Sequence, residues 1–197
     1  MSLILVTGGA RAGKSTFAVQ LAHQLGGDRD VCYLATAEPG DEEMRARIAA
    51  HRAARPAEWR TLEVPRGLAA SWAALANTLS VRVVLLDCLT MLVSNVLLAQ
   101  TDQAGAVEDT WPAVEAEVND LLRFAEQPAV TTIVVTNEVG LGIVPAHRLA
   151  RVYRDLLGRA NQRLASASAF VYLVVSGIPL EIKGMQRPFT GQTGDRE

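Results

Sequence analysis

The sequence gives no sign of disulfides, of a cleavable leader or of a membrane-spanning segment. Its 197 residues include two cysteines, Cys32 and Cys88, and both lie in apolar runs without a pairing pattern. Such cysteines indicate reduced core residues of a cytosolic protein. The start, MSLILVTGG, lacks the basic residues and the cleavage site of a secretory signal. The most apolar window, 81–99, is interrupted by Asp87 and Asn95. It therefore lacks the roughly twenty uninterrupted apolar residues needed to cross a bilayer. We therefore expect a cytoplasmic protein with no membrane anchor.

An excess of positive charge is also missing. The 19 Lys and Arg residues are outnumbered by 21 Asp and Glu residues, which gives a net charge of -2 at pH 7. A general nucleic-acid binder neutralises phosphates with a basic face, so we expect no nucleic acid partner. With 49% hydrophobic and 20% charged residues, the composition is that of a globular chain. We predict a single nucleotide-binding α/β domain over residues 1–185 and a loose tail over residues 186–197.

Short β-branched runs alternate with longer helical patterns. Five runs are continuously apolar, as expected of strands that are buried on both faces: 3–7, 31–36, 83–87, 131–136 and 170–176. Helices are predicted between them at about 14–25, 42–54, 68–79, 106–125 and 146–165. Residues 178–184 fit an antiparallel edge strand after a turn at Gly177. The alternation predicts an α/β fold with a mostly parallel sheet, helices on both faces and an antiparallel C-terminal edge.

The first predicted strand runs directly into GGARAGKS, which matches the phosphate-loop pattern G-x-x-x-x-G-K-[ST]. In such a loop, backbone N–H groups surround a phosphate, the lysine reaches the β and γ phosphates, and the hydroxyl binds Mg2+. The alternative is a chance match in a strand-to-helix turn, but both flanking elements are predicted here. We assign Lys14 a catalytic role and Ser15 a metal-binding role. Nucleotide binding is assigned to Gly8, Gly9, Ala10, Arg11, Ala12, Gly13, Lys14 and Ser15.

Polar residues follow two other predicted strands. Asp87 closes the run VVLLD, where phosphate-loop folds place a carboxylate that faces Mg2+. The alternative for Asp87 is an ordinary acid at the end of a strand. Thr136, Asn137 and Glu138 end the fourth strand, and the carboxyl ends of strands form the usual ligand edge of an open α/β sheet. Asn137 and Glu138 could equally cap the turn in VTNEVGLG, and the sequence leaves both interpretations open.

A histidine lies among arginines in RIAAHRAARPAEW, residues 47–59. On a helix that lasts to Pro56, Arg47, His51 and Arg55 would form one stripe at i, i+4 and i+8. The arginines would disfavour the imidazolium and keep His51 a neutral nucleophile. Its attack on the α phosphorus of a nucleotide would release pyrophosphate and leave a nucleoside monophosphate on the protein. The pattern alone favours the alternative of an arginine-rich helix that covers the phosphates, with His51 as a bystander.

Several segments resemble, in order, one family of bifunctional enzymes. They are GGARAGKS, HRAARPAEWRTLE, LLDCLTMLVSN, TNEVGLGIVP followed by YRDLLGRANQRLA, and VVSGIPLEIKG, and they extend over nearly the whole chain. They are similar to the adenosylcobinamide kinase/adenosylcobinamide-phosphate guanylyltransferases of cobalamin biosynthesis. The resemblance implies a RecA-like phosphate-loop fold, a homotrimer and two reactions. One phosphorylates adenosylcobinamide with a nucleoside triphosphate such as ATP. The other adds GMP from GTP to adenosylcobinamide phosphate through a guanylylated histidine, which His51 matches in the pattern H-x-x-x-R-P-x-x-W.

The same resemblance implies further contacts with GTP and Mg2+. They involve Ala35, Thr36, Ala37, Arg52, Ala53, Ala54, Arg55, Glu63 and Asp87, with Asp87 also as a metal ligand. Glu63 could accept the paired N–H groups on the edge of guanine, or be a surface acid in a loop. Trp59 is expected to pack against the protein and not to stack on a ligand. Ala12 stands where the family has serine, which matters little because backbone groups do most of the phosphate binding.

Two other functions remain as alternatives. A small-molecule kinase with the same phosphate loop and an arginine-rich lid would transfer the γ-phosphate without a covalent nucleotide. A RecA-like ATPase switch with a macromolecular partner would hydrolyse ATP slowly and would need no nucleophilic histidine. The remaining histidines, His23 and His147, are expected to be surface residues. The preferred phosphate donor and the contacts with the corrinoid stay open.

Overall fold

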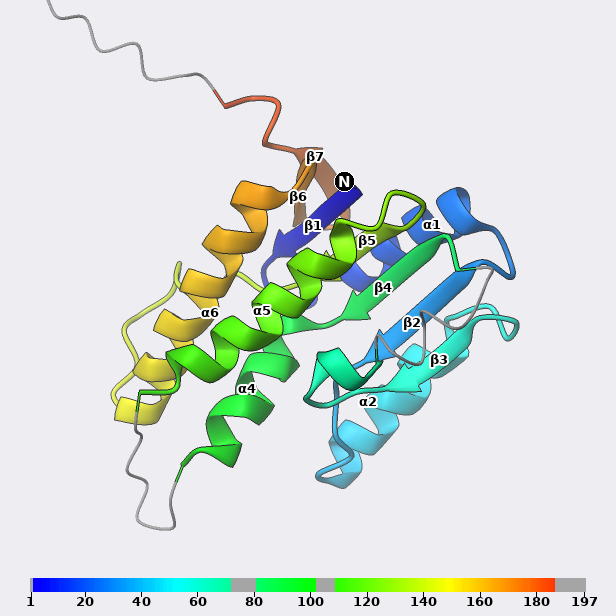
Figure 1. Ribbon diagram of the computed structural model, residues 1–197. Helices are drawn as coiled ribbons and strands as arrows, with labels where there is room; N and C mark the ends of the chain where they lie inside the picture. The colour runs from blue at the N-terminus through cyan, green and yellow to red at the C-terminus, as the bar shows by residue number, and fades with distance from the viewer. Residues whose placement is uncertain (1, 72–80, 102–108, 187–197) are drawn as a thin grey trace, which may run out of the picture.

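Seven strands form one sheet in the computed structural model, which describes residues 2–71, 81–101 and 109–186 (Figure 1). The order across the sheet is β3-β2-β4-β5-β1-β6-β7. All neighbouring strands are parallel except β6 and β7, which are antiparallel. The predicted mostly parallel sheet with an antiparallel C-terminal edge is therefore confirmed. The strands are β1 (Ser2–Gly8), β2 (Val31–Ala35), β3 (Arg60–Glu63), β4 (Val83–Asp87), β5 (Thr131–Val135), β6 (Phe170–Val175) and β7 (Ile178–Glu181).

Helices cover both faces of the sheet, as predicted. They are α1 (Lys14–Gly26), α2 (Glu42–Ala53), α4 (Leu89–Ala99), α5 (Trp111–Ala125) and α6 (Arg148–Ala167). Figure 1 shows α4, α5 and α6 on one face and α1 on the other. Successive side chains of β1 alternate between the two cores: Leu3 and Leu5 pack in the first, Ile4 and Val6 in the second. This two-sided burial explains why the strands are continuously apolar. None of the helices in the described ranges is long and apolar enough to cross a membrane.

Two elements were not predicted. β3 pairs in parallel with β2 at the edge of the sheet, and its four residues, RTLE, are exposed or partly exposed. A short edge strand of this kind carries little apolar signal. α4 follows β4 after Cys88 and has 7 buried residues among its 11. A helix that is buried on most sides lacks the amphipathic period by which helices are recognised.

Two predicted helices begin later than expected: α6 begins at Arg148 and not at about 146, and α5 differs more. Helix α5 starts at Trp111, whereas the pattern predicted a helix over 106–125. Residues 109 and 110 are not helical, and Pro112 occupies the first turn, where its fixed φ and missing N–H are favourable. Residues 106–108 lie outside the described part of the chain.

Two other predicted segments are described only in part. The helix predicted at 68–79 begins at Leu68 and is helical to Ser71, and its remaining residues lie outside the described ranges. Of the predicted tail at 186–197, only Gln186 is described.

Four parallel strands, β1, β2, β4 and β5, end at the same edge of the sheet. The register sets Ala35 of β2 beside Asp87 of β4, and Asp87 beside Val135 of β5. The phosphate loop leaves the end of β1, and the polar segment 136–138 leaves the end of β5. The predicted polar groups therefore meet at the edge where open α/β sheets bind ligands.

Candidate active site

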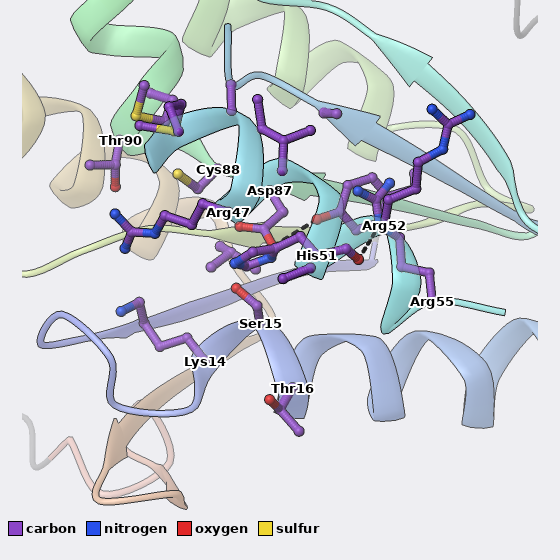
Figure 2. A pocket seen from close by; sticks show the side chains of 18 of the residues that line it. Lys14, Ser15, Thr16, Arg47, His51, Arg52, Arg55, Asp87, Cys88 and Thr90 are labelled. Atoms are coloured by element: carbon purple, nitrogen blue, oxygen red, sulfur yellow. Dashed lines mark hydrogen bonds and ion pairs between the residues drawn. The ribbon is translucent and has the colours of Figure 1, made fainter. Parts of the chain in front are cut away.

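A cavity of about 680 Å³ opens at this edge of the sheet (Figure 2). Its size falls within the roughly 300–1,000 Å³ of typical small-molecule sites. The predicted site residues that line it are Ala10, Arg11, Ala12, Gly13, Lys14, Ser15, Ala35, Ala37, His51, Arg52, Arg55, Glu63 and Asp87. The predicted residues outside its lining are Gly8, Gly9, Thr36, Ala53 and Ala54. The phosphate loop and helix α2 thus share one cavity.

The phosphate loop leads from β1 into α1 at positions that require glycine. Gly8 has a φ of 147°, and a Cβ there would overlap the backbone oxygen of Val174 on β6. Gly13 caps α1 with a φ of 95°, a left-handed conformation that glycine adopts without strain. The amino end of α1 therefore opens toward the cavity, where unpaired N–H groups and the helix dipole favour a bound phosphate.

The ammonium group of Lys14 is held within this loop. Nζ donates a hydrogen bond of 2.6 Å to the carbonyl oxygen of Gly9, and Lys14 is buried. Burial lowers the pKa of Lys14, and Cys88 and Asp87 counteract that effect in part. Because a charged acceptor forms a stronger hydrogen bond than a neutral carbonyl, a phosphate in the loop would draw Nζ away from Gly9.

Helix α2 brings basic side chains to the cavity without being part of either core. It begins after Asp41, whose carboxylate accepts a 2.7 Å hydrogen bond from the N–H of Met44. None of the residues of α2 is buried. Arg47, His51 and Arg52 line the cavity from this helix (Figure 2).

Arg55 lies beyond the end of α2, so it does not extend the stripe that the sequence predicted. The helix ends at Ala53, and the condition that it lasts to the proline is not met. Nε of Arg55 donates to the carbonyl of His51 at 2.8 Å, and a terminal nitrogen donates to the hydroxyl of Thr61 at 3.3 Å. Its guanidinium carbon lies 3.6 Å from the centre of the Tyr33 ring, a cation–π contact. Through these contacts, Arg55 connects the end of α2 with β2 and β3.

His51 lies beside the phosphate loop with its ring against Asp87 (Figure 2). Nδ1 of His51 is 3.7 Å from Oδ2 of Asp87, longer than a hydrogen bond but within ion-pair range. The His51 side chain is 43% exposed and that of Asp87 is 8% exposed, so the ring is open to the cavity and most of the carboxylate side chain is buried at the cavity wall. The sequence argument weighed only the arginines around His51. The structure adds a carboxylate that faces Nδ1 of the ring and not Nε2.

Tyr33 is a site residue that the sequence did not reveal. Its hydroxyl donates a 2.8 Å hydrogen bond to Oδ2 of Asp87, the same oxygen that faces His51. Burial raises the pKa of Tyr33, so the phenol remains a proton donor. Burial alone would raise the pKa of Asp87, but polar contacts from His51, Tyr33 and Ser15 outweigh it and lower that pKa. A tyrosine inside an apolar strand reads as a core residue, and 54 positions separate it from Asp87.

Thr36 was expected at the nucleotide, and its side chain is fully buried next to the site. Its hydroxyl accepts a 2.8 Å hydrogen bond from the N–H of Cys88 and donates a 2.7 Å hydrogen bond to the Cys88 carbonyl. The carbonyl of Thr36 in turn accepts a 2.8 Å hydrogen bond from the side chain of Asn95 on α4. Thr36 therefore holds the backbone that directly follows Asp87.

The segment after β5 is divided between the cavity and the interior. Asn137 lines the cavity, and its N–H donates to the hydroxyl of Thr90 at 3.0 Å. Asn161 of α6 donates to the carbonyl of Asn137 at 3.0 Å and to Oε1 of Glu138 at 3.1 Å, and it accepts from the hydroxyl of Thr136 at 2.7 Å. Of the two interpretations left open, Asn137 lies at the ligand edge, whereas Glu138 is bonded within the protein.

The sequence also led to predictions for Glu63, Trp59 and two further histidines, and the structure places each of them. Glu63 ends β3 and lines the cavity, so it does not lie in a loop. Trp59 is buried and its indole N–H donates to the carbonyl of Gly27 at 3.1 Å, which confirms that it packs against the protein. His23 and His147 are exposed, as expected.

Ser15 and Asp87 are the candidate ligands for Mg2+. Among the described residues there is no group of three or more His, Cys, Asp or Glu side chains that could hold a metal ion. Mg2+ at phosphate sites takes one or two protein oxygens together with phosphate and water. Ser15 lies near enough to Asp87 to lower the pKa of that carboxyl group, and a serine hydroxyl beside an ionised carboxylate fits that donor set.

Sequence relatives of this chain are described as bifunctional proteins. Residues 4–182 match the family described as "Cobinamide kinase / cobinamide phosphate guanyltransferase". The chain is 43% identical over 193 residues to the bifunctional adenosylcobalamin biosynthesis protein CobU of Escherichia coli (strain K12), covering 92% of this chain and 99% of that protein. It is 42% identical over 180 residues to the bifunctional adenosylcobalamin biosynthesis protein CobP of Pseudomonas aeruginosa, covering 91% and 96%.

Solved structures of ATPases share the fold at low sequence identity. An ATPase from a type III secretion system gives a TM-score of 0.56 at 12% identity, covering 93% of this chain and 57% of that one. The ATPase domain of G40P gives 0.52 at 12% identity, covering 87% and 68%. These likenesses confirm the RecA-like phosphate-loop fold. Together with the family match over residues 4–182 and the identities above 40%, the evidence shows that this chain belongs to the cobinamide kinase / cobinamide phosphate guanyltransferase family.

Proposed function

We propose that this enzyme phosphorylates adenosylcobinamide with a nucleoside triphosphate and then transfers GMP from GTP to the product through GMP bound covalently to His51. The observation that carries the covalent step is the position of His51. Its ring lines the same cavity as the phosphate loop, and its Nδ1 faces a buried carboxylate at 3.7 Å. A ring held in this way has one nitrogen oriented and the other free to attack.

The covalent step begins when the lone pair on Nε2 of His51 attacks the α phosphorus of GTP. The N–P bond forms as the bond between that phosphorus and the bridging oxygen breaks, and pyrophosphate leaves with the electron pair. The imidazole gains positive charge, which the carboxylate of Asp87 stabilises. In the second step, an oxygen of adenosylcobinamide phosphate attacks the same phosphorus. The N–P bond breaks, the ring is restored, and adenosylcobinamide-GDP is released.

The basic side chains of the cavity would bind the triphosphate. Lys14 is the cation for the β and γ phosphates in both reactions, because the same loop holds them whichever phosphorus is attacked. Arg47 and Arg52 line the cavity from the same helix as His51 and carry charge close to the α phosphate. Arg55 acts through its contacts with the protein, since its nitrogens already donate to His51 and Thr61.

Guanine would be recognised at the far end of the cavity by Glu63. A carboxylate offers two acceptors to the two N–H groups on the edge of guanine, which adenine does not present. The position of Glu63 at the end of β3, in the cavity lining, supports this role. Ala35, the strand partner of Glu63 in the β2–β3 pairing, also lines the cavity, as does Ala37.

Mg2+ would be held by Ser15 and Asp87 together with the phosphates. When bound, it would neutralise charge on the β- and γ-phosphate oxygens during transfer. The lowered pKa of Asp87 keeps this carboxylate ionised at neutral pH, as a metal ligand must be.

The covalent step can be tested by exposing the protein to GTP labelled on the α-phosphate, with Mg2+ and without corrinoid. We expect one GMP per active chain on His51, with release of pyrophosphate, through a bond that is stable in alkali and labile in acid. His51→Asn should take up no label and should still phosphorylate adenosylcobinamide. Retention of label by His51→Asn, or mapping of the label to His23, His147 or a lysine, would contradict the proposal. A kinase without a covalent step would transfer γ-phosphate and retain no label at all.

We further propose a homotrimer that acts in the cytosol. Large apolar side chains are exposed on the β6–β7 hairpin and on the loop before α6, including Ile178 at 62% and Ile143 at 98%. Neighbouring chains in an oligomer would cover exposed apolar side chains of this kind. Light scattering should give three times 21.1 kDa, and Ile178→Glu should lower that mass. A wild-type monomer at micromolar concentration would refute the trimer.

The proposed location in the cytosol rests on the cysteines. The free thiols of Cys32 and Cys88 suit a reducing compartment.

A further inference from the structure

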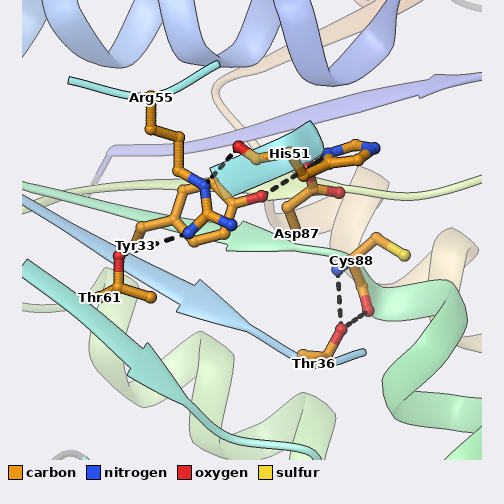
Figure 3. Close-up of polar contacts among 7 residues, drawn as sticks. All are labelled: Tyr33, Thr36, His51, Arg55, Thr61, Asp87 and Cys88. Atoms are coloured by element: carbon orange, nitrogen blue, oxygen red, sulfur yellow. Dashed lines mark hydrogen bonds and ion pairs between the residues drawn. The ribbon is translucent and has the colours of Figure 1, made fainter. Parts of the chain in front are cut away.

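Four residues, His51, Asp87, Tyr33 and Arg55, are linked to one another in a ring of contacts (Figure 3). The ring of His51 faces Oδ2 of Asp87 at 3.7 Å, and the hydroxyl of Tyr33 donates to that same oxygen at 2.8 Å. Arg55 lies over the ring of Tyr33 at 3.6 Å and donates at 2.8 Å to the backbone carbonyl of His51. Both the ring and the main chain of His51 are therefore connected to Tyr33, the first through Asp87 and the second through Arg55.

We infer that Tyr33 is a positioning residue for guanylyl transfer, a role that rests on the proposed covalent step at His51. Tyr33 fixes the carboxylate oxygen that orients Nδ1, and its ring supports the arginine that holds the backbone of the nucleophile. It acts through these neighbours and not on the substrate. Only 2% of its surface is exposed, and the guanidinium of Arg55 covers its ring.

The hydroxyl of Tyr33 is needed because a carboxylate can rotate about its Cβ–Cγ bond. Ser15 also lies near enough to Asp87 to lower the pKa of this carboxyl group, so Tyr33 and His51 are not its only polar neighbours. A hydrogen bond from Tyr33 to Oδ2 keeps that oxygen on the side of His51. Nδ1–H can then close from 3.7 Å to hydrogen-bond distance as Nε2 attacks, because catalytic contacts commonly shorten in the reacting complex.

The hydrogen bond from Tyr33 to Asp87 should matter more for guanylyl transfer than for the kinase reaction. As the N–P bond forms and pyrophosphate leaves, positive charge develops on the imidazole, and its stabilisation depends on Oδ2 being aimed at Nδ1. Phosphorylation of adenosylcobinamide uses no histidine nucleophile, so it would depend on Asp87 only as a ligand of Mg2+, which Ser15 and the phosphates would also hold. Loss of the Tyr33 hydroxyl should therefore slow guanylyl transfer and spare the kinase reaction.

The test is Tyr33→Phe, which removes one oxygen and keeps the ring beneath Arg55. Single-turnover labelling with α-labelled GTP gives the rate constant of self-guanylylation and the GTP concentration for half saturation. We expect the rate constant at saturating GTP to fall about 10-fold, as for a lost hydrogen bond to a charged group, with half saturation changed less than about 2-fold. The kinase rate with ATP in the same preparation should also change less than about 2-fold, and it reports the folded fraction.

Tyr153→Phe is the matched control. Its partly buried hydroxyl donates to the carbonyl of Thr90 at 3.3 Å and has no hydrogen bond to Asp87, so both activities should stay within about 2-fold of wild type. An equal loss of both activities in Tyr33→Phe, or no loss, overturns the inference, as does a rise in half saturation with an unchanged rate constant. If wild type itself takes up no label, the covalent step is refuted and the inference with it. Label in wild type with an unchanged rate in Tyr33→Phe refutes the inference alone.

Discussion

Replacement of Thr36 by valine tests whether this residue binds nucleotide or holds the backbone beside it. The two side chains have nearly the same shape, but valine cannot replace the hydrogen bonds of 2.8 and 2.7 Å to the N–H and carbonyl of Cys88. Each buried hydrogen bond contributes about 1–1.5 kcal/mol, so Thr36→Val should lower the free energy of unfolding by about 2–3 kcal/mol. For a chain of this size, each kcal/mol lowers Tm by about 2–4 °C, which predicts a decrease of about 4–12 °C.

Thermal denaturation followed by circular dichroism measures this decrease, and initial rates of guanylyl transfer at varied GTP measure KM. Thr36→Ser keeps the hydroxyl and should lose less than about half of that stability, because only a buried methyl group is removed. KM for GTP should stay within about 2-fold of wild type in Thr36→Val, since the side chain lies outside the cavity lining. An unchanged Tm together with a large rise in KM would show that the hydroxyl contacts the nucleotide, and would refute the structural role.

Three further outcomes are expected. Lys14→Ala should lower kcat/KM at least about 100-fold in both reactions, because the same ammonium binds the β and γ phosphates in each; a loss in one reaction only would indicate two nucleotide sites. Glu63→Gln should reduce guanylyl transfer more than kinase turnover with ATP, since an amide presents one acceptor where the carboxylate presents two; equal losses would remove Glu63 from the guanine pocket. Burial, with the charge of Asp87, raises the pKa of Cys88 to about 11, so its alkylation by iodoacetamide should accelerate about tenfold per pH unit from pH 7 to 10. Mass spectrometry would follow this reaction, and fully buried Cys32 in the folded protein is the unreactive control; a plateau near pH 8 would contradict the raised pKa.

The features that could be predicted from the sequence are those whose physical cause is local. The glycines and Lys14 of the phosphate loop form a contiguous motif, and two-sided burial makes each parallel strand continuously apolar. Asp87 could be placed because the end of a parallel strand fixes the edge at which its side chain emerges.

The features that escaped prediction depend on which elements become neighbours. Nothing near Tyr33 in the sequence indicates that its hydroxyl meets Asp87, because β2 and β4 become adjacent only when the sheet assembles. The apolar run of α4 carries no helical period because the sheet and two helices surround it. The expected stripe through Arg55 relied on a straight helix, and α2 ends two residues earlier, at Ala53.

The side-chain amide of Asn161 has consequences for what substitutions this chain can tolerate. Its three partners demand two donors and one acceptor from a single buried side chain, and among residues of that size only asparagine offers this set. Aspartate matches the shape but cannot donate, and leucine matches the volume but leaves three polar groups without a partner. A saturation scan of this position should therefore give a profile as restrictive as that of Lys14, although Asn161 is not part of the cavity lining. Residues that only support the ligand edge of the sheet would then tolerate substitution as poorly as residues that take part in the reaction.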